Sequence, residues 1–378
     1  MEIQVKHKHK ILLSIFTVSM LCVLILNAQM YKYPKKENLE KKFNYLSRII
    51  QDSTTNSVSK LNAEWDLFTL SFSTYAATNL VDLDSSFKQQ AIKTIDAAIK
   101  KVLSNDISRH WMNNGNFPQE IDSGASVLYL GQLNLMLGCY RSLSEDSHYN
   151  ALNDKISAHL AKYFSAIPYM CLQSYEGQIW IPDNTVALAS LEMHSRNTGS
   201  DYDEVCKKWV EYTKKHFIDK KTGLLYSTVN YRNGEPMEEP RGAMIGWSIF
   251  FIYRFDEAFA EELYKNYKAN FSNNLLVFRL YRERYENWST NKGDFDSGPL
   301  ILGYSIPANA FAFAGAVAFH DKTNAKRLRR VISLGSKEVE NKDEIFYQTR
   351  FIDFEISPLA EALILFSETM TEWKAETK

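Results

Sequence analysis

The segment GDFDSGPLILGYSIPANAFAFAGAVAF, from Gly293 to Phe319, joins an acidic turn to a long stretch without charge. The turn holds Asp294 and Asp296 between glycines, and Pro299 closes it before the apolar run from Leu300 to Phe319. Proline favours the first turn of a helix, and a helix that is apolar nearly all round is usually buried. The segment therefore predicts a loop that delivers acids to the N-terminus of a buried helix.

The same arrangement recurs along the chain. Glu120-Ile121-Asp122-Ser123-Gly124 precedes a second apolar run, from Ala125 to Cys139. Beyond residue 37, segments with apolar residues at three- and four-residue steps alternate with segments that are apolar almost throughout. The amphipathic segments are 39–50, 87–102, 152–164, 205–216, 259–271 and 325–331, and the apolar segments are 67–80, 125–140, 185–193, 243–253, 300–319 and 359–366.

Six amphipathic helices paired with six buried ones predict an all-α fold, the (α/α)6 barrel, in which six antiparallel helical hairpins form an inner and an outer ring. No Pro-, Ser- or Gly-rich linker interrupts the alternation, so one domain is expected over residues 31–378. The connections that enter the apolar helices are long and place their loops at one rim. Short strands are expected within them at Leu224–Asn230 and Val277–Tyr281, with a turn at Asn233-Gly234, so the rim loops should contain short β-hairpins.

The N-terminus, residues 1–30, reads as a targeting segment. Lys6, Lys8 and Lys10 precede the uncharged run from Ile11 to Asn27. A basic region followed by an apolar region is typical of a secretory signal. The run suits an uncleaved signal anchor, a transmembrane helix, somewhat better than a cleaved signal peptide, and both alternatives stay open. Either one predicts an extracytoplasmic protein, in the periplasm or at the cell surface.

The composition argues against several classes of function. The formal net charge is −1, so no global basic footprint for nucleic acid exists. Outside the N-terminal run, Cys139, Cys171 and Cys206 are too few and too scattered for a disulfide framework or a metal cluster. The eight histidines show no zinc-binding spacing, and His194 is expected to be a hydrogen-bonded core residue. No nucleotide-binding or serine-hydrolase motif is present, so neither a metal nor a cofactor is expected.

The rim loops gather carboxylates and aromatic rings, which is the combination that glycoside hydrolysis requires. One carboxyl protonates the leaving oxygen, a second activates water or attacks carbon, and aromatic faces stack on sugar rings. Asp183 and Asp296 are the expected acid and base, with Asp294 and Glu120 in reserve. The expected substrate-binding residues are Trp111, Asp122, Trp180, Asn184, Arg241, Trp288 and Tyr304.

A structural interpretation competes with the catalytic one for several acids. Asp122 or Ser123, Asp183, and Asp296 or Ser297 all stand where a helix N-cap belongs. Arg241 stands at a helix start, where a cation is unfavourable, and so is expected to pair with a carboxylate or a ligand.

With these features the chain resembles the six-hairpin, (α/α)6-barrel superfamily of bacterial carbohydrate-active enzymes. The resemblance implies a carbohydrate cleft at the rim formed by the N-termini of the inner helices. A more remote resemblance links the chain to linalool dehydratase-isomerase-like domains, which share the barrel. Cys171 could take the place of one of that family's cysteines, whereas the position of the second falls at Asp183.

Three functions remain open from the sequence. The first is an extracytoplasmic glycan-acting enzyme, most simply a glycoside hydrolase with an oligo- or polysaccharide substrate. The second is a lyase or isomerase of the linalool dehydratase-isomerase type. The third is a non-catalytic carbohydrate-binding envelope protein.

Overall fold

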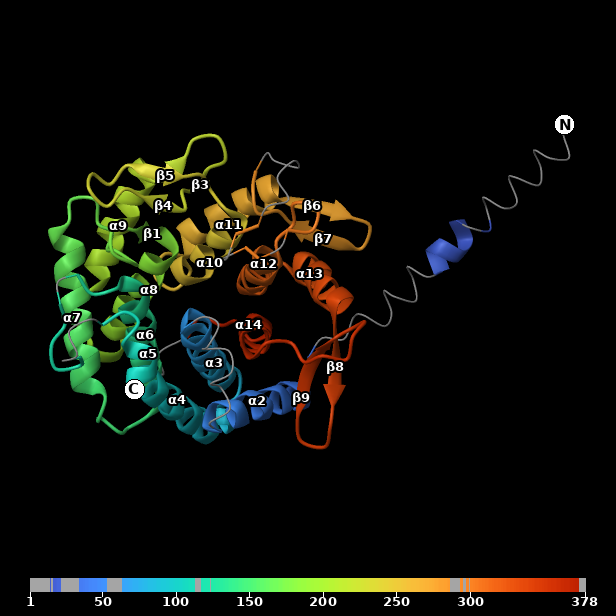
Figure 1. Cartoon of the computed structure of the whole chain (residues 1–378), viewed down its shortest axis with the longest axis horizontal. Helices are drawn as coiled ribbons and strands as arrows, with labels where there is room; N and C mark the ends of the chain where they lie inside the picture. The colour runs from blue at the N-terminus through green and yellow to red at the C-terminus, as the bar shows by residue number, and fades with distance from the viewer. Residues whose placement is uncertain are drawn as a thin grey trace, which may run out of the picture.

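The computed structural model describes residues 14, 16–21, 34–52, 63–112, 117–122, 124–285, 293–294, 297–298 and 300–373. Six helices within this part of the chain form a closed inner ring, in which each contacts the next and the last contacts the first (Figure 1). They are α3 (Ala63–Leu83), α6 (Val127–Leu143), α8 (Ile181–Thr198), α10 (Gly242–Ile252), α12 (Ile306–Ala318) and α14 (Pro358–Glu368).

The outer ring alternates with the inner ring along the chain. Its helices are α2 (Lys36–Gln51), α4 (Lys88–Leu103), α7 (Asn150–Ala166), α9 (Asp203–His216), α11 (Glu257–Phe271) and α13 (Lys322–Gly335). A single turn, η2 (Ser85–Phe87), precedes α4, and the short α5 (Asn105–Ser108) follows it. The predicted two-ring arrangement of six inner and six outer helices is confirmed over these residues.

The pairing of the helices differs from the prediction in one respect. The short turns lead from an inner helix to the outer helix that follows it, as from α10 to α11 at 253–256. The tight hairpins are therefore inner-to-outer, whereas the sequence pattern paired each outer helix with the next inner one. The long outer-to-inner connections are as predicted, and they place the loops at the N-terminal ends of the inner helices.

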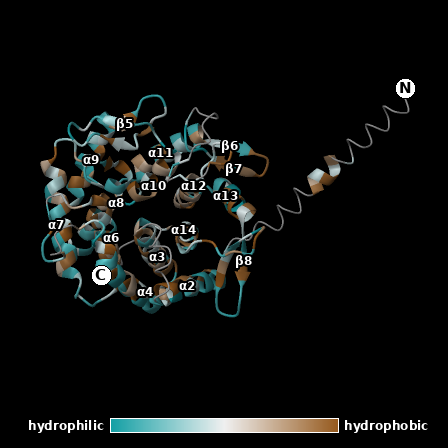
Figure 2. Cartoon of the chain, viewed as in Figure 1, coloured by the Kyte–Doolittle hydropathy of each residue, from teal (hydrophilic) through white to brown (hydrophobic). Residues whose placement is uncertain are grey.

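Burial explains why the two kinds of helix occupy different rings. In α6 every residue from Val127 to Tyr140 is buried, whereas the outer α2 buries one face only. Figure 2 shows hydrophobic and hydrophilic residues side by side on α2 and α4. The centre of the barrel is aromatic, with the ring of Trp247 on α10 in contact with Phe68 and Phe72 from α3, across the ring, and with Phe311 from the neighbouring α12. Each such buried ring contributes roughly 1.5–3 kcal/mol.

Short strands lie within the long connections. One sheet consists, in this order, of β1 (Ile179–Trp180), β4 (Thr228–Val229) and β5 (Pro236–Glu238). In a second sheet, β2 (Ile218–Asp219) pairs with β3 (Leu224–Leu225). Two further hairpins are β6 (Ser272–Leu275) with β7 (Phe278–Tyr281), and β8 (Ser336–Glu340) with β9 (Ile345–Thr349). The strand expected at 277–281 is confirmed as β7. The strand expected at 224–230 is divided into β3 and β4, which belong to different sheets. The turn expected at Asn233-Gly234 has a left-handed glycine (φ 72°).

The predicted helix starts need correction. The α12 helix begins at Ile306 rather than after Pro299, because the Ser305 hydroxyl caps it by accepting from the Ala308 N–H at 3.2 Å. Likewise Ser126, not Asp122, caps α6, so the N-cap interpretation of Asp122 and of Ser297 is wrong. The helix α8 begins at Ile181, which puts Asp183 inside its first turn instead of at the cap. Serine directly before the apolar run satisfies the free N–H groups more closely than an acid several residues upstream.

The predicted targeting segment falls mainly on residues outside the described part. Residues 16–21 are helical there. Among the residues that the structure describes, no helix combines the length and the apolar character needed to cross a membrane.

Candidate active site at the rim

The guanidinium of Arg241, at the start of α10, is the centre of an ionic cluster at the rim. Its Nε donates to Glu283 Oε1 at 2.8 Å and its Nη2 to Asp294 Oδ1 at 2.7 Å, while its Nη1 lies 3.7 Å from Glu238 Oε1. Only 1% of the Arg241 side chain is exposed. A cation at a helix N-terminus is unfavourable on its own, and these carboxylates compensate it. The predicted pairing of Arg241 with carboxylates is confirmed.

The backbone around α10 explains how Glu283 reaches this cluster. The Gly242 N–H donates to the Glu283 carbonyl at 2.8 Å, and the Ala243 N–H donates to Glu283 Oε2 at 3.2 Å. A Cβ at Gly242 would lie 1.9 Å from the Arg282 carbonyl oxygen. Glycine is therefore required for the segment after β7 to approach the start of the helix.

The small sheet brings an aromatic ring to the same cluster. Trp180 in β1 and Glu238 in β5 both pair with Thr228 in β4, so the three side chains project from the same face. The Arg241 guanidinium carbon lies 5.9 Å from the centre of the Trp180 ring, within cation–π range. Trp180 directly precedes α8, whose first turn carries Asp183. The loops before α8 and α10 thus meet at one place on the rim.

The environment shifts the pKa values of Asp294 and Glu283 in opposite directions. Burial opposes ionisation of Asp294, but the Ser297 N–H and the Arg241 guanidinium hold its pKa below the usual value. Burial raises the pKa of Glu283, although Arg241 counteracts the shift. Separated pKa values among neighbouring carboxyls are what acid–base catalysis needs.

Asn184 and Tyr304 have identifiable partners. The Asn184 amide accepts from the Leu172 N–H at 2.7 Å and donates to the carbonyls of Leu172 and Trp180. It is fully buried and holds the loop before α8 in place, so we leave it out of the proposed substrate site. The Tyr304 hydroxyl accepts from Asn273, and the preceding Gly303 carbonyl accepts from the Glu283 N–H at 3.1 Å. The backbone next to Tyr304 therefore contacts Glu283, whereas the Tyr304 hydroxyl is bound to β6.

The connection before α6 contacts α6, α7 and the loop before α8, where the Ser126 hydroxyl donates to the Ser174 carbonyl at 2.6 Å. Trp111 stacks on Tyr129 of α6, with ring centres 5.6 Å apart, and Lys155 of α7 donates to the carbonyls of Pro118 and Gln119. Glu120 and Asp122 are exposed on this loop. Their predicted roles remain predictions, and Asp296 and Trp288 lie outside the described residues.

Glu283 is the functional candidate that the sequence interpretation missed. It lies within Tyr281-Arg282-Glu283-Arg284, immediately after a strand that was itself predicted. An acid between two arginines is typical of an exposed, charged segment, so the sequence did not indicate that Glu283 is buried. Its position at a strand exit on the rim was the available signal.

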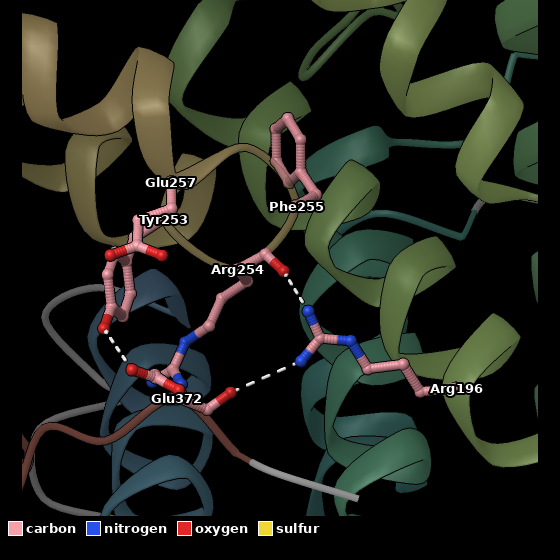
Figure 3. Close-up of a pocket in the computed structure, with 6 residues that line it drawn as sticks. All are labelled: Arg196, Tyr253, Arg254, Phe255, Glu257 and Glu372. Atoms are coloured by element: carbon pink, nitrogen blue, oxygen red, sulfur yellow. Dashed lines mark hydrogen bonds between the residues drawn. The ribbon is translucent and has the colours of Figure 1, made fainter.

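A pocket of about 200 Å³ lies at the opposite end of the barrel, near the C-terminal ends of α8 and α10 (Figure 3). There Arg196 donates to the carbonyls of Arg254 and Glu372, and the Arg254 guanidinium carbon lies 3.7 Å from the centre of the Trp373 ring. Arg254 also donates to the Thr371 carbonyl. These contacts hold residues 370–373 against the end of the barrel, so the pocket belongs to the anchoring of the tail.

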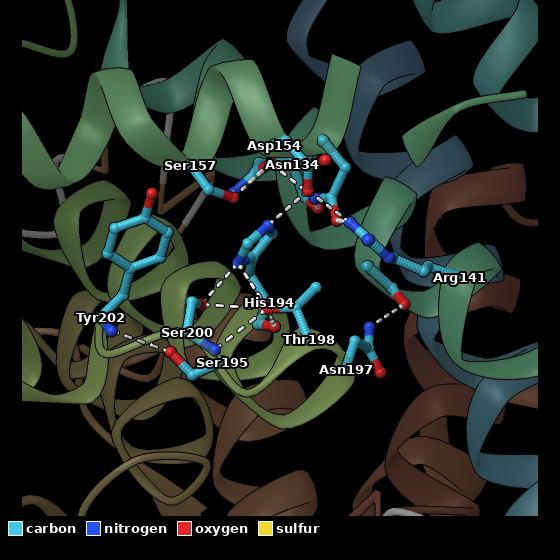
Figure 4. Close-up of polar contacts among 12 residues, drawn as sticks. Asn134, Arg141, Asp154, Ser157, His194, Ser195, Asn197, Thr198, Ser200 and Tyr202 are labelled. Carbon is cyan, nitrogen blue, oxygen red and sulfur yellow. Dashed lines mark hydrogen bonds and ion pairs between the residues drawn. The ribbon is translucent and has the colours of Figure 1, made fainter. Parts of the chain in front are cut away.

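His194 joins three elements away from the rim (Figure 4). Its Nε2 lies 2.8 Å from Asp154 Oδ1 of α7, and its Nδ1 lies 2.9 Å from the Ser200 hydroxyl, just after α8. Arg141 pairs with the same Asp154 oxygen, and the Thr198 hydroxyl donates to the His194 carbonyl. His194 is 4% exposed, so the prediction of a hydrogen-bonded core histidine is confirmed.

Cys171 does not have the environment of a reactive thiol. It is fully buried, and burial raises its pKa to about 12. A thiol with this pKa stays protonated at neutral pH and is a poor nucleophile. The structure therefore removes the residue on which the dehydratase-isomerase alternative depended.

No known family model matches the chain. Among solved structures, it is similar to the unsaturated glucuronyl hydrolase of Bacillus sp. GL1 (TM-score 0.57, 12% identity, covering 90% of this chain and 98% of that one). It is also similar to a family 105 glycoside hydrolase of C. acetobutylicum (TM-score 0.56, 13% identity, covering 86% of this chain and 98% of that one). A third similar structure is an inactive variant of the family 76 α-1,6-mannanase of Salegentibacter sp. HEL1_6 in complex with α-1,6-mannotriose (TM-score 0.53, 10% identity, covering 89% of this chain and 99% of that one). At these identities the likeness establishes the fold.

Proposed function

Because the chain has the fold of the six-hairpin glycosidase superfamily, we propose that it is a glycoside hydrolase whose site is the Arg241 cluster at the rim. One observation carries the proposal: carboxyls with opposed pKa shifts surround a buried guanidinium beside the Trp180 ring. The complex of the mannanase with α-1,6-mannotriose supports an oligosaccharide as the substrate class.

The two roles rest on different observations. Asp294 is held ionised by Arg241 and is assigned as the base. The general acid is assigned to Asp183 from its position, in the first turn of the helix that Trp180 directly precedes. Asp183 donates its proton to the glycosidic oxygen as the bond from that oxygen to the anomeric carbon breaks. Water then bonds to the anomeric carbon and passes a proton to Asp294. Arg241 positions Asp294, and the Trp180 face stacks on a sugar ring.

The test is turnover of a glycan panel, measured by release of reducing ends. Asp183→Asn and Asp294→Asn should each lower kcat by about 10²–10⁴-fold in protein that still unfolds cooperatively, and Asp294→Asn should also lose the stability of its ion pair with Arg241. Retention of full turnover by both variants would refute the assignment. Glycan binding without any product would instead favour the non-catalytic carbohydrate-binding protein.

We also propose that the protein acts outside the cytoplasm. The support is the sequence pattern of Lys6, Lys8 and Lys10 before the uncharged run Ile11–Asn27. Cell fractionation checks this directly, and recovery in the cytoplasmic fraction alone would contradict it.

A further inference from the structure

The rim cluster contains a second guanidinium, that of Arg284, and both it and Arg241 are paired with carboxylates. Glu238 Oε1 lies 3.0 Å from Arg284 Nη1 and 3.7 Å from Arg241 Nη1, so it is shared between them. Arg241 is further bound by Glu283 and Asp294. Recognition of a sugar carboxylate requires a cation with donors directed at the ligand. Here the donors of Arg241 and the Nη1 donor of Arg284 are directed at the protein's own acids.

The side chains of the cluster differ in how far they are exposed to solvent. The Arg241 side chain is 1% exposed, whereas the side chains of Asp294 and Glu238 are 43% and 28% exposed. The Arg284 side chain is 37% exposed and pairs with Glu238. A ligand approaching from solvent thus meets Asp294 and the Glu238–Arg284 ion pair first, with the Arg241 guanidinium beneath them. The two guanidiniums and three carboxylates carry a net charge of −1 when all are ionised, and protonation of Glu283 would bring the group only to neutrality. Asp183 adds a further acid on α8.

We infer that the glycan accepted at this site is uncharged, and that chains bearing uronic acids are disfavoured there. The inference rests on the proposed function and extends it to the charge of the substrate. The fold alone does not decide this point, since the similar structures include both a glucuronyl hydrolase and an α-1,6-mannanase. A sugar carboxylate would face Asp294 and Glu238 at close range, where like charges repel most strongly. The Trp180 ring offers a stacking face that suits a neutral sugar.

The experiment compares kcat/KM for neutral manno- and gluco-oligosaccharides with kcat/KM for unsaturated glucuronyl disaccharides, using the full chain at low ionic strength. Neutral glycans should be preferred by at least about tenfold, and the preference should shrink in 0.5 M salt, where charges are screened (Debye length of roughly 3–10 Å). Equal or faster turnover of the uronic acid substrate would overturn the inference and leave the hydrolase assignment standing. Failure to bind or cleave either class would overturn the proposed function and the inference together.

A matched pair of variants isolates the charge effect. Glu238→Gln releases Arg284 and removes one partner of Arg241, so the ratio of uronic acid to neutral turnover should rise about tenfold. The control is Glu261→Gln on α11, whose carboxylate also pairs with a cation, Lys265 at 2.9 Å, away from the rim. The control should leave the ratio unchanged. A folded Glu238→Gln protein with an unchanged ratio would contradict the inference.

Discussion

The guanidinium of Arg241 lies 2.7 Å from the carboxylate of Asp294, a residue 53 positions further along the chain. This ion pair joins the N-terminus of inner helix α10 to the acidic loop that precedes inner helix α12. A rim acid held at a fixed place by a buried cation has both the ionisation state and the rigidity expected of a catalytic base.

Replacing Arg241 should impair both stability and catalysis. In Arg241→Ala, three carboxylates lose their buried counter-charge, which costs roughly 3–5 kcal/mol of unfolding free energy. Arg241→Lys keeps the charge but not the two directed donors, so it should retain most of the stability while kcat falls. Denaturant unfolding together with turnover separates the two effects. Equal stability of the alanine variant and the native chain would show that the cluster is not the buried ion network described above.

The acid limb of the pH–rate profile should report the ionisation of Asp294. Its pKa is depressed in the folded protein, so activity and the stability from its ion pair should persist above its usual pKa and be lost as pH falls through the depressed value. In Arg241→Lys the weaker pairing should move this limb to higher pH. An acid limb that stays in place in the variant would mean that another group sets it.

Glu361, in the first turn of α14, should make stability fall with rising pH. Burial raises its pKa from the usual 4.5 to about 8. The folded protein therefore holds a proton that the unfolded chain releases, so stability falls between about pH 4.5 and pH 8. Glu361→Gln can still accept from the Tyr347 N–H and should gain about 2–4 kcal/mol relative to the native chain at pH 9, but little at pH 4.5. Glu340→Gln, at an exposed carboxylate paired with Lys41, is the control. A gain that is constant across pH would contradict the assignment.

The polar contacts of His194 should matter for stability and not for turnover. His194→Ala breaks the links to Asp154 and Ser200 and should cost roughly 1–3 kcal/mol, measured by thermal unfolding. Ser200→Ala should leave glycan hydrolysis unchanged, because these residues lie away from the rim. His216→Ala, on the exposed side of α9, provides a control of the same residue type. Loss of hydrolysis in folded Ser200→Ala would point to catalysis at this second location.

Gly242→Ala should be poorly tolerated. The added Cβ would meet the Arg282 carbonyl oxygen, so the segment that carries Glu283 must move away from α10. We expect a loss of roughly 1–3 kcal/mol or more, with a fall in activity as Glu283 and Arg241 separate. Gly335→Ala meets no atom within 4 Å and is the matched control. Similar melting temperatures for the two variants would contradict the close approach.

Local sequence patterns were enough to predict the alternation of helices and the rim on which the proposed site lies. Hydrophobic periodicity is a local property, so the apolar runs that became α6 and α10 and the amphipathic ones that became α2 and α9 could be recognised without contacts. The long loops before the inner helices followed from the same alternation. The starts of α6 and α12 were misplaced because an acid and a serine both suit an N-cap, and only the packing of the helix decides which one is used.

The partners of Arg241 were decided only by the tertiary structure. The sequence indicated that Arg241 should pair with a carboxylate or a ligand. Its partners, Glu283 and Asp294, lie more than forty residues further along the chain, in the connection that leads to α12. Long-range pairing depends on how inner helices pack against one another, which no local pattern encodes. Burial, which raises the pKa of Glu283 and of Cys171, likewise arises only when the rings close.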